Sequence, residues 1–132
     1  MIQIKGEIRD QIIEHAEKEL PNEACGYLAG RDGVIIKAFK MNNIDKSPEH
    51  FTFDPVEQFN VFREVRKLGL DIIANYHSHP STPSRPSEED IRLANDPDIS
   101  YMIISLAEKD TVVRSFRIQN SISEAEEIEI LN

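Results

Sequence analysis

The first half of the chain opens with a helical pattern of apolar residues. Within residues 7–20, apolar side chains recur every four positions, a spacing that places them on one face of a helix. This stripe consists of Ile8, Ile12, Ala16 and Leu20. Pro21 follows it and predicts the end of the helix. His15 falls on the polar side, so we expect it to be solvated.

A second helix is predicted from its start and stop residues. Asp54 suits the N-cap position, Pro55 the first helical position and Glu57 the third. The helix should run to Leu68 and end at Gly69, because glycine readily adopts the backbone conformation that terminates helices.

Short apolar stretches bounded by turn residues predict the strands. They occupy residues 2–4, 24–30, 34–39, 51–53, 70–76, 101–106, 111–118 and 128–131. Arg31-Asp32-Gly33 predicts a hairpin turn between the second and third of these strands. Strands interleaved with helices indicate an α/β fold built around a mixed sheet.

Composition narrows the class of protein. A chain of 132 residues, 39% hydrophobic and 30% charged, is expected to form one globular domain. No apolar run approaches the roughly 20 residues that span a bilayer, and no signal peptide is recognisable, so a cytoplasmic location is the default expectation. A net charge of −9 argues against a broad electrostatic grip on nucleic acid.

The single cysteine limits the chemistry further. Cys25 cannot form an internal disulfide, and one cysteine rules out a cysteine-rich metal site. We expect Cys25 to be a small buried residue. A redox-sensing thiol is the alternative.

The strongest chemical signal follows the strand predicted at residues 70–76. His77 and His79 are one residue apart, so on a strand their side chains point to the same side and can close on one ion. Asp90 lies shortly downstream on another element. Two histidines and one aspartate form a ligand set that zinc accepts, and three protein ligands leave a fourth position open for water, as in catalytic zinc sites.

Each part of this pattern also has a purely structural interpretation. A His-x-His pair alone is more often found on a surface than bound to a metal. Ser87 and Asp90 are typical of the start of a helix, predicted here over residues 87–95, with serine as the N-cap and an acid three residues later. The two interpretations of Asp90 are compatible, because a helix can begin there and still present the carboxylate to a metal.

The complete pattern resembles the signature of the JAMM (MPN-plus) metalloprotease family. The matching residues are His77-Ser78-His79-Pro80, six further residues and then Ser87-x-x-Asp90, with Glu23 upstream at the start of an apolar strand. The resemblance covers nearly the whole chain and is greatest to the small stand-alone prokaryotic members. It implies one JAMM/MPN-plus domain over residues 1–132, with the single-domain MPN/JAMM fold: an α/β, cytidine-deaminase-like mixed sheet flanked by helices.

The resemblance also implies a role for each site residue. His77, His79 and Asp90 would bind Zn²⁺, Glu23 would be the general base and acid, and Ser87 would donate a hydrogen bond to the oxyanion of the reacting carbonyl. The chemistry is consistent, because zinc lowers the pKa of a bound water to roughly 7 and a nearby carboxylate can take and return its proton. Glu17 and Glu19 lie close enough along the chain to compete with Glu23 for the base.

The implied reaction is hydrolysis of a peptide or isopeptide bond after the C-terminal Gly-Gly of a ubiquitin-like or sulfur-carrier protein. Three other classes of function compete with it. A non-catalytic MPN-type interaction scaffold would lack the metal ligands, which are all present here. A RadC-like, DNA-repair-associated protein shares a similar motif, but this chain shows no helical DNA-binding region before it and is acidic. A zinc deaminase would require paired cysteines.

Overall fold

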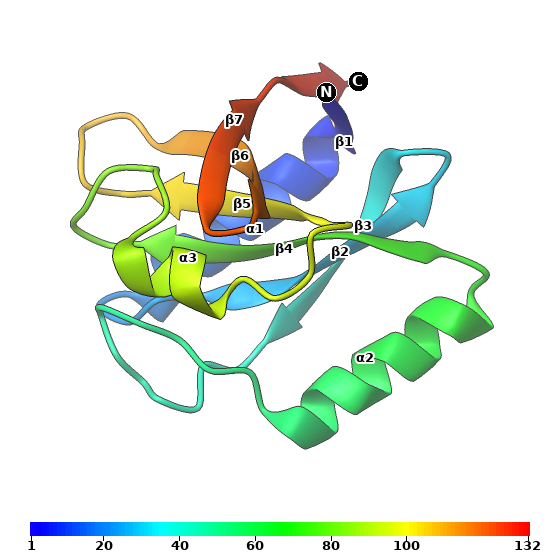
Figure 1. Cartoon of the computed structure of the whole chain (residues 1–132), viewed down its shortest axis with the longest axis horizontal. Coiled ribbons are helices and arrows are strands. Elements are labelled where there is room, and N and C mark those ends of the chain that lie inside the picture. The colour runs from blue at the N-terminus through cyan, green and yellow to red at the C-terminus, as the bar shows by residue number, and fades with distance from the viewer.

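The computed structural model describes all 132 residues, which form eight strands and three helices (Figure 1). The helices are α1 (Gly6–Glu19), α2 (Pro55–Lys67) and α3 (Glu88–Leu93). The strands are β1 (Ile2–Lys5), β2 (Cys25–Arg31), β3 (Val34–Met41), β4 (Asp71–His79), β5 (Ser100–Ser105), β6 (Val112–Gln119), β7 (Ile122–Glu126) and β8 (Ile128–Leu131). None of the helices combines the length and the apolar character that a membrane crossing requires.

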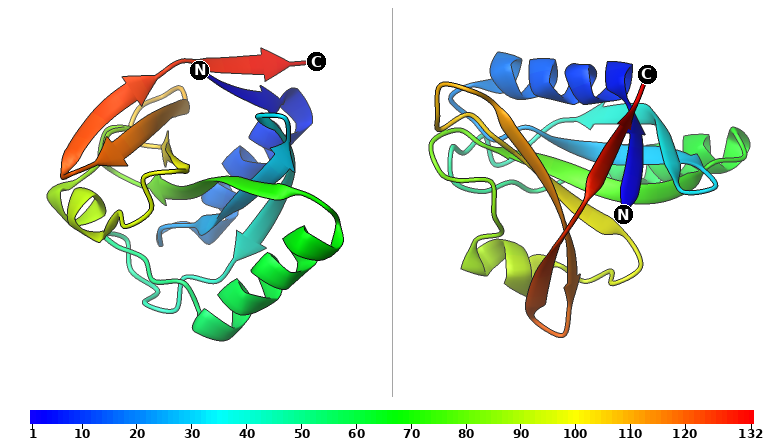
Figure 2. Two further views of the ribbon diagram at one scale, coloured as in Figure 1. Left: turned by 45° about the vertical axis from the view of Figure 1, so that its right-hand side comes forward. Right: turned by 90° about the horizontal axis from the view of Figure 1, so that it is seen from above.

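All eight strands belong to one mixed sheet in the order β7-β6-β5-β4-β2-β3-β1-β8. Strand β1 is parallel to β3 and β8, and β4 is parallel to β5, while the other neighbours are antiparallel. The two outer strands, β7 and β8, are separated along the chain by Glu127 alone, whose carbonyl accepts a hydrogen bond from the Ile2 N–H at 2.9 Å. The sheet therefore curls so that the chain passes directly from one edge to the other (Figure 2).

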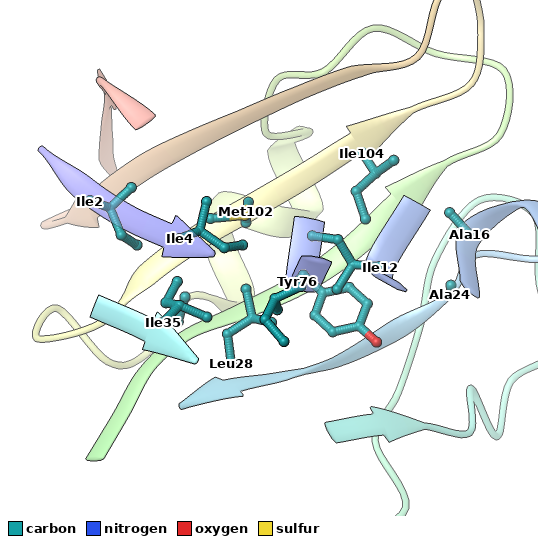
Figure 3. Packing of buried hydrophobic residues seen from close by; sticks show 12 residues of the cluster. Ile2, Ile4, Ile12, Ala16, Ala24, Leu28, Ile35, Tyr76, Met102 and Ile104 are labelled. Carbon is teal, nitrogen blue, oxygen red and sulfur yellow. The ribbon is translucent and has the colours of Figure 1, made fainter. Parts of the chain in front are cut away.

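One face of the sheet packs against α1 in a continuous apolar core (Figure 3). Ile8, Ile12 and Ala16 are buried as their spacing predicted, whereas Leu20, just past the helix end, is 48% exposed. The sheet contributes Ile2, Ile4, Leu28, Ile35, Tyr76, Met102 and Ile104. Gly26 is required beside this core, because a Cβ there would collide with the Tyr76 ring.

The opposite face of the sheet is covered by α2 and α3. Val61 and Val65 of α2 pack into a cluster with Cys25, Tyr27 and Met41. Ile91 of α3 packs against a cluster that includes Tyr101 and Ile103. Strand β4 thus lies between α1 on one side and the two shorter helices on the other (Figure 1).

The predicted mixed α/β fold is confirmed, and so are its main start and stop signals. Asp54 caps α2, because its Oδ1 accepts a hydrogen bond from the Val56 N–H at 2.9 Å, and Pro55 is the first helical residue. The predicted hairpin turn between β2 and β3 is present, with positive φ angles of 52° at Asp32 and 77° at Gly33. Positive φ at both central residues is the conformation that tight hairpins favour.

Four local predictions were wrong. Residues 51–53 form no strand, and only an isolated bridge joins Asn43 to Phe53. Helix α3 ends at Leu93, two residues early, and β7 was not predicted because its alternating acidic residues resemble a solvated segment. His15 is buried rather than solvated, since its Nδ1 lies 2.8 Å from the Tyr76 hydroxyl.

Candidate metal centre

The two histidines at the end of β4 face one another across a short gap. Strand β4 extends through His79, so the alternation of side chains places both imidazoles on the side of the sheet that α2 and α3 cover. Their Nε2 atoms are 3.1 Å apart. Each Nε2 is also 3.1 Å from Oδ2 of Asp90. The three predicted ligands therefore form a nearly equilateral triangle of ligand atoms.

The start of α3 delivers Asp90 to this triangle. Ser87 is the N-cap, with its Oγ accepting from the Asp90 N–H at 3.0 Å while Asp90 Oδ2 accepts from the Ser87 N–H at 2.9 Å. This reciprocal capping fixes the carboxylate relative to the helix end. Burial alone would raise the pKa of Asp90, but the hydrogen bonds from His77 and His79 outweigh burial and hold that pKa well below its usual range.

The outer nitrogens of the two imidazoles have different surroundings. His79 Nδ1 lies 2.8 Å from the carbonyl oxygen of Pro83, which requires a proton on Nδ1, so in the neutral imidazole Nε2 carries the lone pair that a metal ligand needs. Burial opposes protonation of His79, but hydrogen bonding to Asp90 and Pro83 raises its pKa overall. His77 Nδ1 is buried without a hydrogen-bond partner, and the Phe51 ring stacks on this imidazole with centroids 4.8 Å apart.

Glu23 lies in the segment just before β2 and is almost completely buried, with 3% of its surface exposed. Its Oε1 has no hydrogen-bond partner. Burial raises the pKa of Glu23 to about 8, and the nearby Asp90 and Glu89 carboxylates add to the rise while His79 opposes it. A carboxyl group with a pKa near neutrality suits a residue that both accepts and donates protons.

Ser78 connects the Glu23 segment to the histidine strand. Its side chain points away from the two imidazoles, as strand alternation predicted, and its Oγ accepts from the Ala24 N–H at 2.7 Å. The Ser78 N–H donates to the Ala24 carbonyl at 3.0 Å. Ser78 therefore hydrogen-bonds within the fold, and it fixes the residue after Glu23 to the strand between the two histidines.

A cavity of about 340 Å³ adjoins the triangle on the side of the two shorter helices. His77 and Asp90 form part of its wall. Most of the remaining wall is aromatic or aliphatic and includes Tyr27, Phe51, Phe53, Leu93, Tyr101 and Ile103. Cys25 is buried close by, where burial raises its thiol pKa to about 12, so the prediction of an inert buried cysteine is the one that the structure supports.

The residues of the triangle fit a zinc ion. Ligand atoms at roughly 2.0–2.2 Å from a tetrahedral zinc lie roughly 3.4 Å apart, close to the spacing of these three atoms. When His79 is neutral with its proton on Nδ1, its Nε2 has only a lone pair, which faces the lone pairs of the Asp90 oxygen. A cation within the triangle would satisfy all three ligand atoms.

The fold and this cluster define a single-domain α/β protein with a candidate three-ligand metal centre at the end of a central strand. Residues 6–119 match the family described as prokaryotic homologs of the JAB domain. The chain therefore belongs to the prokaryotic JAB family, of the JAMM/MPN type that the motif resembled.

Individual relatives agree with this assignment. The chain is 30% identical to the CysO-cysteine peptidase of Mycobacterium tuberculosis over 131 residues, which cover 97% of this chain and 90% of the relative. It is 30% identical to the desampylase of Haloferax volcanii over 111 residues, 79% and 80% of the two chains. The solution structure of a Desulfitobacterium hafniense protein superposes with a TM-score of 0.91 at 46% identity, covering 99% of this chain and 93% of that one.

The structure brings three of the five predicted site residues together, with the ligand atoms of His77, His79 and Asp90 within 4.8 Å of one another. Glu23 is buried near enough for His79 and Asp90 to influence its pKa, and Ser87 is exposed at the start of α3.

The residues that support this site were not predicted from the sequence. Phe51 stacks on His77, and Asn43 and Ser47 contact the backbone of Glu23. All three lie in a polar segment without periodicity, which offered no signal beyond the presence of a loop.

Proposed function

We propose that the chain is a zinc-dependent metallopeptidase that hydrolyses a peptide or isopeptide bond after the C-terminal Gly-Gly of a ubiquitin-like or sulfur-carrier protein. The observation that carries the proposal is the triangle of His77, His79 and Asp90 with the buried carboxyl group of Glu23 beside it. Family membership and the names of the relatives support the same chemistry.

In this proposal His77, His79 and Asp90 hold zinc, and zinc supplies a Lewis acid that makes a water molecule nucleophilic at neutral pH. Pro83 keeps the proton of His79 on Nδ1, so that Nε2 points into the centre as a ligand. Glu23 accepts a proton from the attacking water and returns it to the leaving nitrogen.

Ser87 would stabilise the negative charge that develops on the oxygen of the scissile carbonyl. Its Oγ accepts from the Asp90 N–H, so its own O–H proton remains available to an incoming substrate. Replacing Ser87 by alanine should lower kcat by about 10²–10³, the usual cost of losing one such donor. Ser87→Thr keeps both the cap and the hydroxyl and should retain most of the activity. Equal kcat values for the alanine and threonine variants would remove Ser87 from this role.

The proposed substrate class follows from the relatives and from the shape of the chain's own site. The similar proteins are named as a CysO-cysteine peptidase and a desampylase. The imidazoles are largely buried, with His77 and His79 only 3% and 5% exposed. A Gly-Gly tail suits such a site, because a backbone without side chains can approach the metal closely. Strand addition to a sheet edge could align the extended tail.

The decisive experiment uses a sulfur-carrier protein from the source genome, extended after its Gly-Gly by a cysteine or by a short peptide. Mass spectrometry should show cleavage after the second glycine with zinc-loaded protein, and no cleavage after chelation. A branched substrate, linked through a lysine side chain, tests isopeptide cleavage in parallel.

The same preparation discriminates the competing functions. Protein that takes up no zinc on reconstitution and cleaves nothing would be a scaffold. Stoichiometric zinc without cleavage, together with tight DNA binding, would favour the RadC-like alternative.

A further inference from the structure

The backbone of Glu23 is held by a loop rather than by the sheet. Strand β2 begins at Cys25, so the backbone groups of Glu23 take part in no strand pairing. The Glu23 N–H donates to the carbonyl of Ser47 at 2.8 Å. The Glu23 carbonyl accepts from the side-chain amide of Asn43 at 3.1 Å. Both partners belong to the loop of residues 42–53.

The side-chain amide of Asn43 also makes several hydrogen bonds within that loop. Its Nδ2 makes a second donation, to the His50 carbonyl at 3.0 Å, and its Oδ1 accepts from the N–H groups of Asp45 at 3.1 Å and Thr52 at 3.2 Å. All four hydrogen-bonding positions of a carboxamide are thus occupied. An aspartate of the same shape could accept these two bonds but could not donate to either carbonyl.

The same loop contacts both Glu23 and the histidine pair. At one end Asn43 contacts Glu23, and near the other end Phe51 stacks on the imidazole of His77. On its other side the Glu23 segment is fixed through Ala24, whose N–H and carbonyl both bond to Ser78. Glu23 therefore lies between two anchors, of which Ser78 belongs to the metal-binding strand and Asn43 to the loop.

We propose that Asn43 is a positioning residue for the reaction: its side-chain amide holds the main chain of Glu23 so that the carboxyl group faces the space beside His77, His79 and Asp90. This inference rests on the proposed function. The carboxyl oxygen Oε1 is buried without a hydrogen-bond partner that would fix it. Its placement therefore depends on the backbone anchors. A misplacement of about 1 Å near reacting atoms can cost ~10² in rate.

The test compares Asn43→Asp with Asn43→Ala and with a matched control, Asp45→Asn. The control removes the negative charge of Asp45, which contacts His50 and Thr52 inside the same loop, but it leaves the Asn43–Glu23 contact in place. Each zinc-loaded protein is assayed with the extended sulfur-carrier protein. Zinc per chain is measured separately, and amide hydrogen exchange at Glu23 is followed by NMR in the metal-free state.

Both Asn43 variants should lose about 10–100-fold in kcat with little change in KM. They should retain full zinc content and exchange the Glu23 amide hydrogen faster than the wild type. Asp45→Asn should match the wild type in all four measurements. Wild-type kcat in either Asn43 variant would overturn the inference, and so would an equal loss in Asp45→Asn or a loss of zinc that accounts for the fall in kcat.

One measurement needs no variant and therefore does not depend on variant folding. In the wild-type protein, the Glu23 backbone amide and the Asn43 side-chain amide should both exchange slowly. Rapid exchange of either would contradict the anchor directly. A wild type without turnover would instead contradict the proposed function and, with it, the catalytic consequence of the anchor. Turnover in the wild type with undiminished kcat in the Asn43 variants would contradict this inference alone.

Discussion

Two groups of buried histidines lie on opposite faces of strand β4. On the α1 face, His15 Nδ1 pairs with the Tyr76 hydroxyl at 2.8 Å, and His15 Nε2 lies 3.5 Å from a carboxylate oxygen of Glu19. The two rings meet edge to face, with centroids 5.9 Å apart. Both nitrogens of this imidazole have partners, as is usual for a buried polar group that serves the fold.

The histidines on the other face begin with the next residue of the strand, His77. Fewer of the buried polar atoms there have hydrogen-bond partners. His77 and His79 direct their Nε2 atoms toward one another and toward the same oxygen of Asp90. His77 Nδ1 and Glu23 Oε1 are buried without partners.

The contrast indicates which buried polar groups stabilise the fold and which would serve the proposed reaction. A buried polar atom without a partner costs about 1–3 kcal/mol, so a fold retains several in one place only when something else compensates for them. A bound cation at the triangle would satisfy the two facing Nε2 atoms and the Asp90 oxygen, and its binding free energy would offset the cost of the neighbouring atoms that stay without partners. The His15–Tyr76 pair needs no added ligand. Substitutions on the two faces should therefore have different effects. Those on the face of His77 and His79 should remove zinc or turnover, and those on the α1 face should only lower stability.

The largest effect is expected for Asp90→Ala. Loss of one of three protein ligands, and of the carboxylate that separates two facing imidazoles, should abolish both stoichiometric zinc binding and turnover. Metal analysis after reconstitution would measure the zinc binding, and the cleavage assay would measure the turnover. Glu88→Ala is a suitable control, because Glu88 is exposed in the first turn of the same helix. An Asp90→Ala protein that still binds one zinc per chain would rule out the proposed ligand set.

Glu23→Gln should have the next largest effect, and a more selective one. The amide keeps the size of the side chain but cannot accept a proton, so kcat should fall by about 10²–10⁴ while zinc content stays unchanged. Glu17→Gln tests the alternative base on α1 and should keep wild-type kcat, since Glu17 is exposed there. If Glu17→Gln were the inactive variant of the two, the assignment of the base would be reversed.

The fold and the clustering of His77, His79 and Asp90 could be predicted because their signals are local. Four-residue spacing defined α1, a cap and a proline defined the start of α2, and the His-x-His alternation placed two imidazoles on one side of β4. The support of Glu23 could not be predicted in this way. Asn43 and Ser47 reach Glu23 over 20 and 24 positions of sequence, through contacts that depend on the loop's conformation. The error at His15 has the same origin, because its partner Tyr76 is 61 positions away.

Tyr76→Phe tests the structural face with a smaller expected effect. The substitution removes only the hydroxyl and leaves His15 Nδ1 buried without its partner, so the free energy of unfolding should fall by about 1–3 kcal/mol. Zinc content and kcat should not change, because the ring still packs against Gly26 and the apolar core. Urea denaturation of the zinc-loaded protein measures the free energy of unfolding. Metal analysis and the cleavage assay on native protein measure zinc content and kcat. A large loss of kcat without a loss of stability would show that the two faces are not independent.

The smallest effect should come from the protonation of His15. Burial lowers the pKa of His15 below its ordinary value, although the neighbouring Glu19 partly opposes the shift. The unfolded chain then binds a proton at this residue more readily than the folded one, so stability should fall as the pH drops below about 6.5. His15→Gln lacks this titration, and its stability should depend less on pH than that of the wild type between pH 7.5 and 5.5, a range chosen to bracket the unfolded pKa of about 6.5.

The comparison is best made by urea denaturation of metal-free protein in chelator, because acid would otherwise release zinc from the opposite face. His77 and His79 are common to both proteins, so the difference between the two curves isolates His15. Parallel curves would mean that His15 titrates alike in the folded and unfolded states, which would contradict the effect of burial on its pKa.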